Sequence, residues 1–410
     1  MDVKSGYKTK KLVCVTLDNN NKYYDMQQLN SSEWEATWGR VGVTSSKKIY
    51  SMNEWESKYR EKLKKGYKDQ TELFVVASNK RDFIGIKDSS IALIVRDLQS
   101  FANKSVAANY TVTTDQVTQK QIDTAQLILN ELSSLVKNDS STSRFNDCLI
   151  KLWTTVPRRI ANTREAVLQF GTFNSPDKFD FTNKLLVEEQ SSLDIMRGQV
   201  NVSNVQKNQD DSSDLNILDA MGIKFSLADD DDVKVIKSKL GEIKDKFTSA
   251  WKIVNNRTQE KFNNFVSTVS NKKTELFWHG SRNENWWSII DSGLMIRPSS
   301  AVYTGSMYGD GIYGASLSRK SYGYTSAKGS YWAKGSSSRC FMSLFDFHVG
   351  NQLLIHKHSS WCYDLNWNVL RKKGDFHSAY GVKGADLRND EFIVYKPDQV
   401  TIKYLVELMG

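Results

Sequence analysis

Cysteine is scarce in this chain, with four residues among 410, at positions 14, 148, 340 and 362. They are far apart, and none belongs to a CxxC pair or to a spacing typical of Cys/His zinc ligands. The sequence therefore predicts free thiols in a reducing compartment, with neither a disulfide framework nor a metal site.

Long hydrophobic runs are also missing. No apolar stretch approaches the roughly 20 residues that span a bilayer. The first residues, Met1 to Ser5, have no apolar segment behind their charge, so they do not read as a signal peptide. We expect an intracellular protein with no membrane partner.

The formal charge is +9, from 56 Lys and Arg residues against 47 Asp and Glu residues. A basic balance favours a polyanionic partner, although many basic proteins bind no nucleic acid. At 410 residues the chain also exceeds what one hydrophobic core usually serves, so two or three domains are expected.

The first part of the chain, residues 1–75, combines short β-rich runs with turn signals and many aromatic residues. Residues 12–17 are typical of a strand, and the Asp-Asn-Asn-Asn run at 18–21 indicates a turn. Apolar residues at helical spacing then predict a helix within residues 51–65. This part is expected to form a small β-rich domain.

The next part, from about residue 89 to 200, has a helical apolar period. Ile91, Ile94, Leu98 and Phe101 recur every three or four residues, and the same spacing returns between residues 122 and 136. We expect an all-α helical bundle here. A polar linker is predicted over residues 201–213.

The last part begins with a predicted amphipathic helix whose apolar face carries Ile236, Leu240, Ile243 and Phe247. The four aspartates before it, at 229–232, could bind a cation, but capping and the helix dipole explain them better.

Beyond residue 274 the chain is rich in glycine and aromatic residues, with short strand-like runs at 276–278 and 392–395. A helix is predicted to start near Asn283 and to end at Gly293. This part reads as a mainly β domain with interspersed helices.

Two segments of the last part offer a ligand both bare backbone and polar groups. In the first, Gly280 follows His279 and adds no side chain, and the Ser281 hydroxyl can donate and accept. In the second, residues 304–313, glycines form a close-approach loop and tyrosines could stack on a flat ring. The loop matches neither a P-loop nor a GxGxxG turn.

A third segment places Glu391 at the head of a strand-like apolar run. In a cleft, such a carboxylate can accept a sugar hydroxyl and stabilise a developing cation. From the residues alone the alternatives stay open: a structural histidine, core tyrosines and an exposed strand end.

These three segments, in this order, resemble the catalytic domain of the poly(ADP-ribose) polymerase family, and the resemblance covers roughly residues 214–410. It maps the His-Tyr-Glu triad of that family onto His279, Tyr313 and Glu391. The implied co-substrate is NAD, with no metal, and the implied reaction releases nicotinamide while an acceptor attacks the ribose.

The resemblance also assigns roles to individual residues. His279 would hold the adenine-side ribose, and the Gly280 backbone and Ser281 hydroxyl would hold the nicotinamide carboxamide. Glu391 would orient the nicotinamide ribose and support its positive charge. The nicotinamide ring itself would be enclosed by stacking tyrosines and by lining residues, which are Tyr313, Tyr324, Lys320 and Ser321.

Three segments depart from the family pattern. Residues 314–316 are Gly-Ala-Ser where the polymerases usually have Phe-Ala-Asp, and Met295 replaces an arginine near adenosine. Arg297, two residues later, is the substitute that we assign to cofactor binding. Asn389 stands where chain-elongating members often carry tyrosine, which speaks against long polymers more than against transfer.

The other two parts resemble the DNA-dependent members of the same family. Residues 21–24 and the Trp-Gly-Arg motif at 38–40 are similar to the WGR domain, which implies DNA-end binding with Trp38 stacking and Arg40 meeting phosphate. The 119–123 stretch, Gln-Lys-Gln-Ile-Asp, opens a long helix and resembles the helical regulatory domain, which hinders NAD binding until DNA engages the WGR domain.

The sequence therefore predicts a multidomain α+β protein: a WGR domain over residues 1–80, a helical regulatory domain over 88–200 and a mainly β ADP-ribosyltransferase domain with flanking helices over 214–410. The expected partners are DNA ends or nicks and acceptor proteins, including the chain itself. The expected location is the nucleus in a eukaryotic host and otherwise the cytoplasm or nucleoid.

Two other functions stay open. One is a mono-ADP-ribosyltransferase, and a transferase that is independent of DNA is an intermediate case. The other is a catalytically silent module that binds DNA ends, against which the intact His279, Tyr313 and Glu391 argue.

Overall fold

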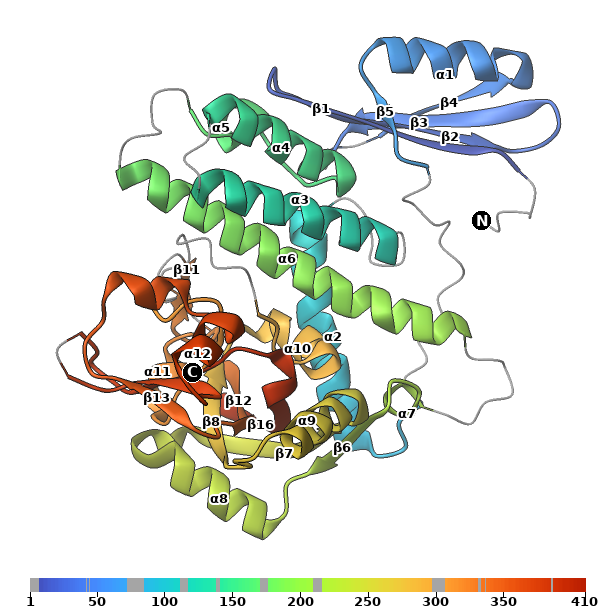
Figure 1. Ribbon diagram of the computed structural model, residues 1–410. Helices are drawn as coiled ribbons and strands as arrows, with labels where there is room; N and C mark the ends of the chain where they lie inside the picture. The colour runs from blue at the N-terminus through green and yellow to red at the C-terminus, as the bar shows by residue number, and fades with distance from the viewer. Residues whose placement is uncertain are drawn as a thin grey trace. The chain divides into compact units, whose positions relative to one another are not determined.

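The computed structural model describes residues 7–41, 43, 45–71, 85–110, 117–137, 141–169, 176–208, 216–296, 307–330, 333–335, 337–384 and 386–410. The chain forms two compact units. One contains residues 1–82 and 103–203, and the other contains residues 83–102 and 204–410 (Figure 1). The fold is mixed α and β, as predicted. The domain bounds inferred from composition stay a prediction.

The first unit opens with a five-stranded antiparallel sheet in the order β4-β3-β2-β1-β5. Helix α1 (Trp55–Lys64) lies over one face of it, as Figure 1 shows. The core between them contains Leu12, Met26, Trp34 and Trp55. The strands are β1 (Thr9–Thr16), β2 (Asn20–Gln28), β3 (Glu33–Arg40), β4 (Ser46–Ser51) and β5 (Lys68–Asp69). We call residues 7–71 the β module.

The helical segment follows the β module, and its predicted helices are confirmed. They are α2 (Ser89–Asn109), α3 (Gln119–Lys137), α4 (Thr142–Thr155), α5 (Thr163–Ala166) and α6 (Pro176–Asn208). Side chains join α6 to its neighbours: Gln190 to Gln126 of α3, and Glu189 to the Trp153 indole N–H of α4. The predicted linker at 201–213 is wrong over its first half, because α6 continues to Asn208.

Hydrogen bonds tie the β module to the segment between α4 and α5. The Asn21 side-chain amide donates to the Arg158 carbonyl at 2.9 Å, and the Arg40 guanidinium donates to the Ala161 carbonyl at 2.7 Å. In return, the Thr163 backbone N–H donates to the side-chain oxygen of Asn19 at 3.0 Å. This junction fixes residues 158–163 against the turn between β1 and β2.

The second unit contains the catalytic part suggested by the resemblance, built on two sheets. The larger has the order β6-β7-β16-β12-β8 and the smaller has the order β13-β14-β15-β9. Backbone hydrogen bonds between Trp278 and Ala315 join β8 to the residue after β9. The strands are β6 (Ile223–Leu227), β7 (Phe247–Asn255), β8 (Thr274–Gly280), β9 (Ile312–Gly314), β12 (Arg339–His348), β13 (Gln352–Ile355), β14 (Ser378–Gly381), β15 (Glu391–Val394) and β16 (Val400–Met409). The short hairpin β10 (Gly329–Ser330) and β11 (Ala333–Lys334) stands apart.

Short helices flank these sheets. They are α7 (Ile217–Ala220), α8 (Asp230–Leu240), α9 (Asn256–Thr268), α10 (Trp286–Ser292), α11 (Ser318–Tyr322) and α12 (Trp367–Lys373). Gly293 ends α10 in a left-handed conformation with φ of 78°, as predicted. Asp229 caps α8 by accepting from the N–H groups of Asp231 and Asp232, which confirms the capping interpretation.

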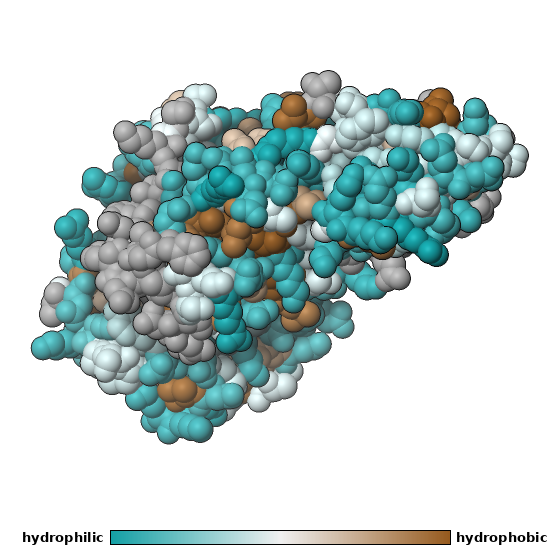
Figure 2. Space-filling model, turned by 90° about the horizontal axis from the view of Figure 1, so that it is seen from above, coloured by the Kyte–Doolittle hydropathy of each residue, from teal (hydrophilic) through white to brown (hydrophobic). Residues whose placement is uncertain are grey.

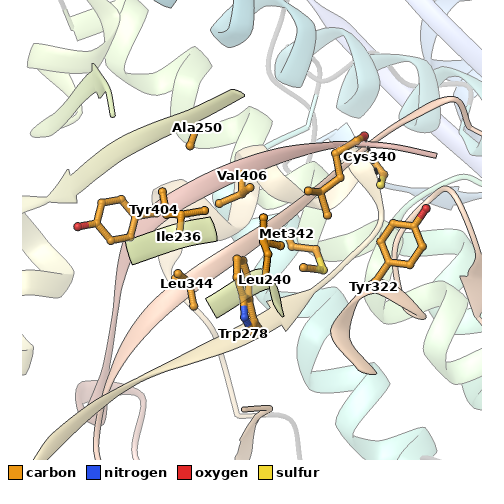
Figure 3. Close-up of a cluster of buried hydrophobic side chains, with 11 residues drawn as sticks. Ile236, Leu240, Ala250, Trp278, Tyr322, Cys340, Met342, Leu344, Tyr404 and Val406 are labelled. Atoms are coloured by element: carbon orange, nitrogen blue, oxygen red, sulfur yellow. Dashed lines mark hydrogen bonds between the residues drawn. The ribbon is translucent and has the colours of Figure 1, made fainter. Parts of the chain in front are cut away.

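Helix α8 is shorter than the sequence pattern suggests. It ends at Leu240 because Gly241 takes a φ of 54°, and the chain then forms a 3-10 turn before β7 begins at Phe247. Figure 3 shows the buried cluster that contains Ile236 and Leu240. Ile243 and Phe247 still pack against this cluster. The apolar pattern therefore predicted the buried residues correctly, but it placed Ile243 and Phe247 in a helix that ends before them.

The first half of α2 belongs to the second unit. There, Arg339 of β12 forms ion pairs with Asp97 of α2 and with Glu407 of β16. The Phe101 and Phe341 rings meet edge to face with centroids 6.4 Å apart. These contacts anchor the start of α2 to the larger sheet.

The face of the molecule in Figure 2 is mostly hydrophilic, with hydrophobic residues in separate patches. Among the described residues, no helix is both long and apolar enough to cross a membrane. Within the same ranges, no group of three or more His, Cys, Asp or Glu side chains could hold a metal ion. All four cysteines are free and buried.

Candidate active site

The predicted catalytic residues come together from both sheets of the second unit. His279 and Gly280 end β8 of the larger sheet, while Tyr313 of β9 and Glu391 of β15 belong to the smaller sheet. Ile393 is the register partner of Tyr313, so Glu391 lies just beyond the paired end of β9. The Trp278–Ala315 bridge holds the two sheets at this point.

His279 lies half-buried between aromatic rings. The rings of Trp286 and Phe345 meet it edge-on, with centroids 6.4 and 6.0 Å away. Burial lowers the pKa of His279 to about 4, and a hydrogen bond to the Tyr313 backbone opposes this effect. The imidazole is therefore neutral near pH 7 and suited to hydrogen bonding rather than to acid catalysis.

Gly280 has no room for a side chain. A Cβ atom built there would lie 1.8 Å from the Ser321 carbonyl oxygen of α11. The Ser321 hydroxyl donates to the Trp278 carbonyl at 3.2 Å, which holds α11 against β8. The Ser281 hydroxyl accepts from the Asn285 side-chain amide at 2.9 Å. Bare backbone is thus exposed beside two hydroxyl groups.

Tyr313 closes the glycine-rich loop before β9. Its hydroxyl accepts from the Tyr308 backbone N–H and donates to the Gly309 carbonyl, both at 3.0 Å. Gly309 has a φ of 73°, and a Cβ there would lie 2.0 Å from the Leu365 carbonyl oxygen. The loop therefore has one tightly held shape from residue 308 to 313, which fixes the Tyr313 ring.

Glu391 is held from one side only. Its Oε1 accepts from the Lys320 ammonium at 2.5 Å, and the two side chains are 15% and 21% exposed. Its Oε2 is buried and has no hydrogen-bond partner among the described residues. A buried carboxylate oxygen without a donor is costly, so this atom is a ready acceptor for a ligand hydroxyl.

The charge of Glu391 reaches three tyrosines. Burial, followed by repulsion from Glu391, raises the pKa of Tyr308 to about 12 and also raises the pKa of Tyr324. Burial raises the pKa of Tyr313 as well, and Glu391 adds to the effect. All three hydroxyls stay protonated at neutral pH and can therefore donate hydrogen bonds near the Glu391–Lys320 ion pair.

Gly314 explains one departure from the family pattern. A Cβ there would lie 2.8 Å from the Phe277 side chain and 2.9 Å from the Phe347 ring. Phe277 in turn stacks on Phe392, the residue after Glu391, with centroids 4.1 Å apart. Phenylalanine side chains of β8 and β12 thus occupy the space that a larger residue at 314 would need.

The sequence did not single out one residue that shapes the site, and one predicted site residue cannot be placed. The sequence assigned no separate role to Tyr308 within the glycine-rich loop. In the structure, its backbone N–H positions Tyr313 and its carbonyl accepts from the Tyr395 hydroxyl at 2.8 Å. An aromatic residue beside glycine in such a loop was the only available signal. Arg297 lies outside the described residues.

The two predicted DNA contacts, Trp38 and Arg40, lie on β3 of the first unit. Trp38 is half-buried and stacks on Tyr24, with centroids 5.9 Å apart. Arg40 donates to Asn19 as well as to Ala161, so its guanidinium is part of the junction. Its contact with phosphate stays a prediction.

The catalytic part of the chain is similar to known proteins. Residues 233–409 match the family described as the poly(ADP-ribose) polymerase catalytic domain. Two proteins of Invertebrate iridescent virus 6 are similar: "Uncharacterized protein 101L" is 32% identical over 57% of this chain and 95% of its own length, and "Putative poly [ADP-ribose] polymerase-like 100L" is 31% identical over 43% of this chain and 93% of its own.

A plant relative extends over almost the whole chain. "Poly [ADP-ribose] polymerase 2" of Zea mays is 24% identical over 95% of this chain and 68% of its own length. This plant similarity, the two viral similarities and the matched catalytic domain point to the same family. The chain therefore belongs to the poly(ADP-ribose) polymerase family and is an NAD-dependent ADP-ribosyltransferase.

Proposed function

We propose that the chain attaches short ADP-ribose chains to itself and to other proteins, and that DNA breaks stimulate this activity. The observation that carries the catalytic part is the buried Oε2 of Glu391, which has no hydrogen-bond partner in the part of the chain that the structure describes, beside its Lys320-bound Oε1. In this arrangement Lys320 fixes one carboxylate oxygen, and the other oxygen can accept from a ribose hydroxyl.

In this proposal, the residues around Glu391 bind and orient NAD. The Gly280 backbone and the Ser281 hydroxyl hold the carboxamide, and the Tyr313 and Tyr324 rings enclose the nicotinamide. Neutral His279 holds the adenine-side ribose of NAD, and Arg297 is assigned to the adenosine part of NAD. Ser321 supports β8 through its hydrogen bond to the Trp278 carbonyl.

The reaction breaks the bond between nicotinamide and the ribose anomeric carbon, and the acceptor nucleophile forms the new bond there. Positive charge develops on the ribose as nicotinamide leaves. A carboxylate fixed close to that ribose stabilises the charge, and the buried setting strengthens the interaction. Lys320 fixes the carboxylate in place, which limits the reorganisation that the step requires.

The substitution Glu391→Gln tests the catalytic role. It keeps the size of the side chain but removes the charge, so transfer of labelled ADP-ribose should fall by about 100-fold or more. Glu275→Gln is the matched control, because Glu275 lies on β8 in an ion pair with Lys273. Equal loss in both variants, or none in Glu391→Gln, contradicts the assignment.

DNA stimulation is proposed on the basis of the β module. Two lysines lie over the partly exposed ring of Tyr50: Lys48 is 4.9 Å from its centroid, and Lys58 is 5.6 Å from it. Interleaved cations and aromatic rings suit a nucleic-acid backbone and its exposed terminal base. The junction through Arg40 offers a direct route from this surface to the helical segment.

A rate assay with and without nicked DNA tests this part. Wild-type transfer should rise on adding DNA, and Trp38→Ala should lose most of that rise because the stacking platform is removed. Trp361→Ala is the control, since Trp361 is an exposed tryptophan in the other unit. Identical DNA responses in both variants would remove Trp38 from the mechanism.

Product length is proposed to be short because Asn389 replaces the tyrosine frequent in chain-elongating members. A gel of labelled product should show a compact ladder, and Asn389→Tyr should extend it toward a smear. A single sharp band from wild type would instead support transfer of one unit only.

A further inference from the structure

A cavity of about 470 Å³ lies within the helical part of the first unit. Its walls come from the end of α4, the segment 158–162, α5 and the first half of α6. Its volume falls within the range of pockets that hold small molecules, roughly 300–1,000 Å³. It lies in a different compact unit from His279, Tyr313 and Glu391.

The floor of the cavity is apolar and rigidly held. Trp153, Phe181 and Leu185 line it, and the Trp153 indole N–H donates to the Glu189 carboxylate at 3.0 Å. Glu189 is buried and also forms an ion pair with Arg158. This pairing consumes the charge of Arg158, one of the cations that line the cavity.

The remaining charges of the lining balance one another. Arg159 and Lys184 face the cavity together with Glu165 and Glu188, which makes two cations and two carboxylates. The Arg159 Nε donates to the Tyr110 carbonyl at 2.8 Å, and Glu165 accepts from the Asn162 side-chain amide at 2.6 Å. Arg159, Glu165 and Lys184 are exposed to solvent, so the cavity offers a charged ligand no buried, unbalanced counter-charge. The part of a ligand that leaves water meets the apolar floor, where an unpaired charge is unfavourable.

One wall of the cavity is also part of the junction with the β module. The carbonyl groups of Arg158 and Ala161, two residues of this wall, accept from Asn21 and Arg40 of the β module. A ligand in the cavity would therefore brace a segment whose backbone is already tied to the β module.

We propose that this cavity binds a small, uncharged and largely apolar molecule about the size of a two- or three-ring aromatic compound, and that its occupancy stabilises the junction segment 158–163. The proposal does not depend on DNA stimulation or on the product of the enzyme. It adds a second ligand site to the chain, outside the catalytic unit.

Fluorescence titration of the full chain with N-phenyl-1-naphthylamine, an uncharged probe, tests the binding site. Saturable one-to-one binding is expected. Ala166→Trp should weaken it at least tenfold because Ala166 lines the cavity and indole would fill it. Leu127→Trp, at a 70% exposed position on α3, should leave binding within twofold of wild type. Ala161→Leu, on the junction wall, is the second variant if Ala166→Trp does not fold.

Two comparisons make the proposal falsifiable. The anionic analogue 8-anilino-1-naphthalenesulfonate should bind at least fivefold more weakly than the uncharged probe, and tighter binding would overturn the assigned ligand class. Amide hydrogen exchange over residues 158–166 should slow at least threefold with bound probe, and unchanged exchange would overturn the coupling. Equal probe affinity in Ala166→Trp and Leu127→Trp would overturn the site itself.

Discussion

Gly280 offers a sharp test of the catalytic geometry, because a single added methyl group should displace it. In Gly280→Ala the new Cβ would start 1.8 Å from the Ser321 carbonyl oxygen and 2.7 Å from the carbonyl carbon. Ordinary contacts between such atoms are about 3.3 Å or longer. The backbone of β8 and the backbone of α11 must therefore move apart by about 1.5 Å.

The cost of that movement has two parts. Overpacking of this kind destabilises a protein by about 1–3 kcal/mol, which lowers the melting temperature of a unit of this size by about 3–10 °C. The effect on turnover should be larger in relative terms. A displacement of 1 Å at a positioning element can reduce a rate about 100-fold, and here the displaced elements carry Ser281, Lys320 and Ser321.

The assay is kcat/KM for NAD, measured together with the melting temperature. Gly384→Ala is the control, since a Cβ at that glycine meets no atom within 4 Å. We expect a loss of about 100-fold in kcat/KM for Gly280→Ala at a temperature where both variants are folded. A Gly280→Ala protein with wild-type stability and turnover would refute the inferred close contact.

Further expectations concern charged groups in the second unit. Lys320→Met should lower kcat/KM by about 10- to 100-fold because Glu391 loses its charge-assisted hydrogen bond, and Lys320→Arg should recover part of it; equal rates for Met and Arg would argue against a positioning role. The folded-state pKa of His279, about 4, lies below its unfolded value of 6.5; its contribution to stability is therefore complete above pH 6.5 and is lost as pH falls toward 4. Denaturant unfolding at several pH values checks this, and His279→Asn should flatten the profile in that window. Arg339→Leu should destabilise the chain by about 1–3 kcal/mol, because Glu407 is left nearly buried without its partner; an unchanged free energy of unfolding would contradict it.

Local signals carried most of the fold prediction. Gln119 opens α3 as expected, and Gly293 ends α10, because capping and periodicity act over a few neighbouring residues. The same periodicity misplaced the end of α8. Ile243 and Phe247 lie on the expected buried face, but a change of backbone direction at Gly241 places them in a turn and a strand.

The parts of the site that the sequence could not predict depend on contacts between distant residues. Lys320 and Glu391 are 71 residues apart, and their ion pair exists only because α11 and β15 meet. Likewise, Arg40 reaches Ala161 across 121 residues, so the motif that suggested a phosphate contact gave no hint of the junction. The resemblance of three ordered segments to the family identified the site residues. The contacts between these residues became visible only in the folded structure.

The four cysteines have a practical consequence for measuring motion in this protein. Each is buried, and burial raises the pKa of the Cys14 and Cys340 thiols and that of Cys148 to about 12. Because the thiolate is the reactive form, maleimide dyes should not label the folded wild-type chain. Cysteines introduced at the exposed positions Leu127 and Leu227, one in each compact unit, would then accept a donor and an acceptor dye. Single-molecule energy transfer between them would report how the separation of the units responds to DNA and to NAD.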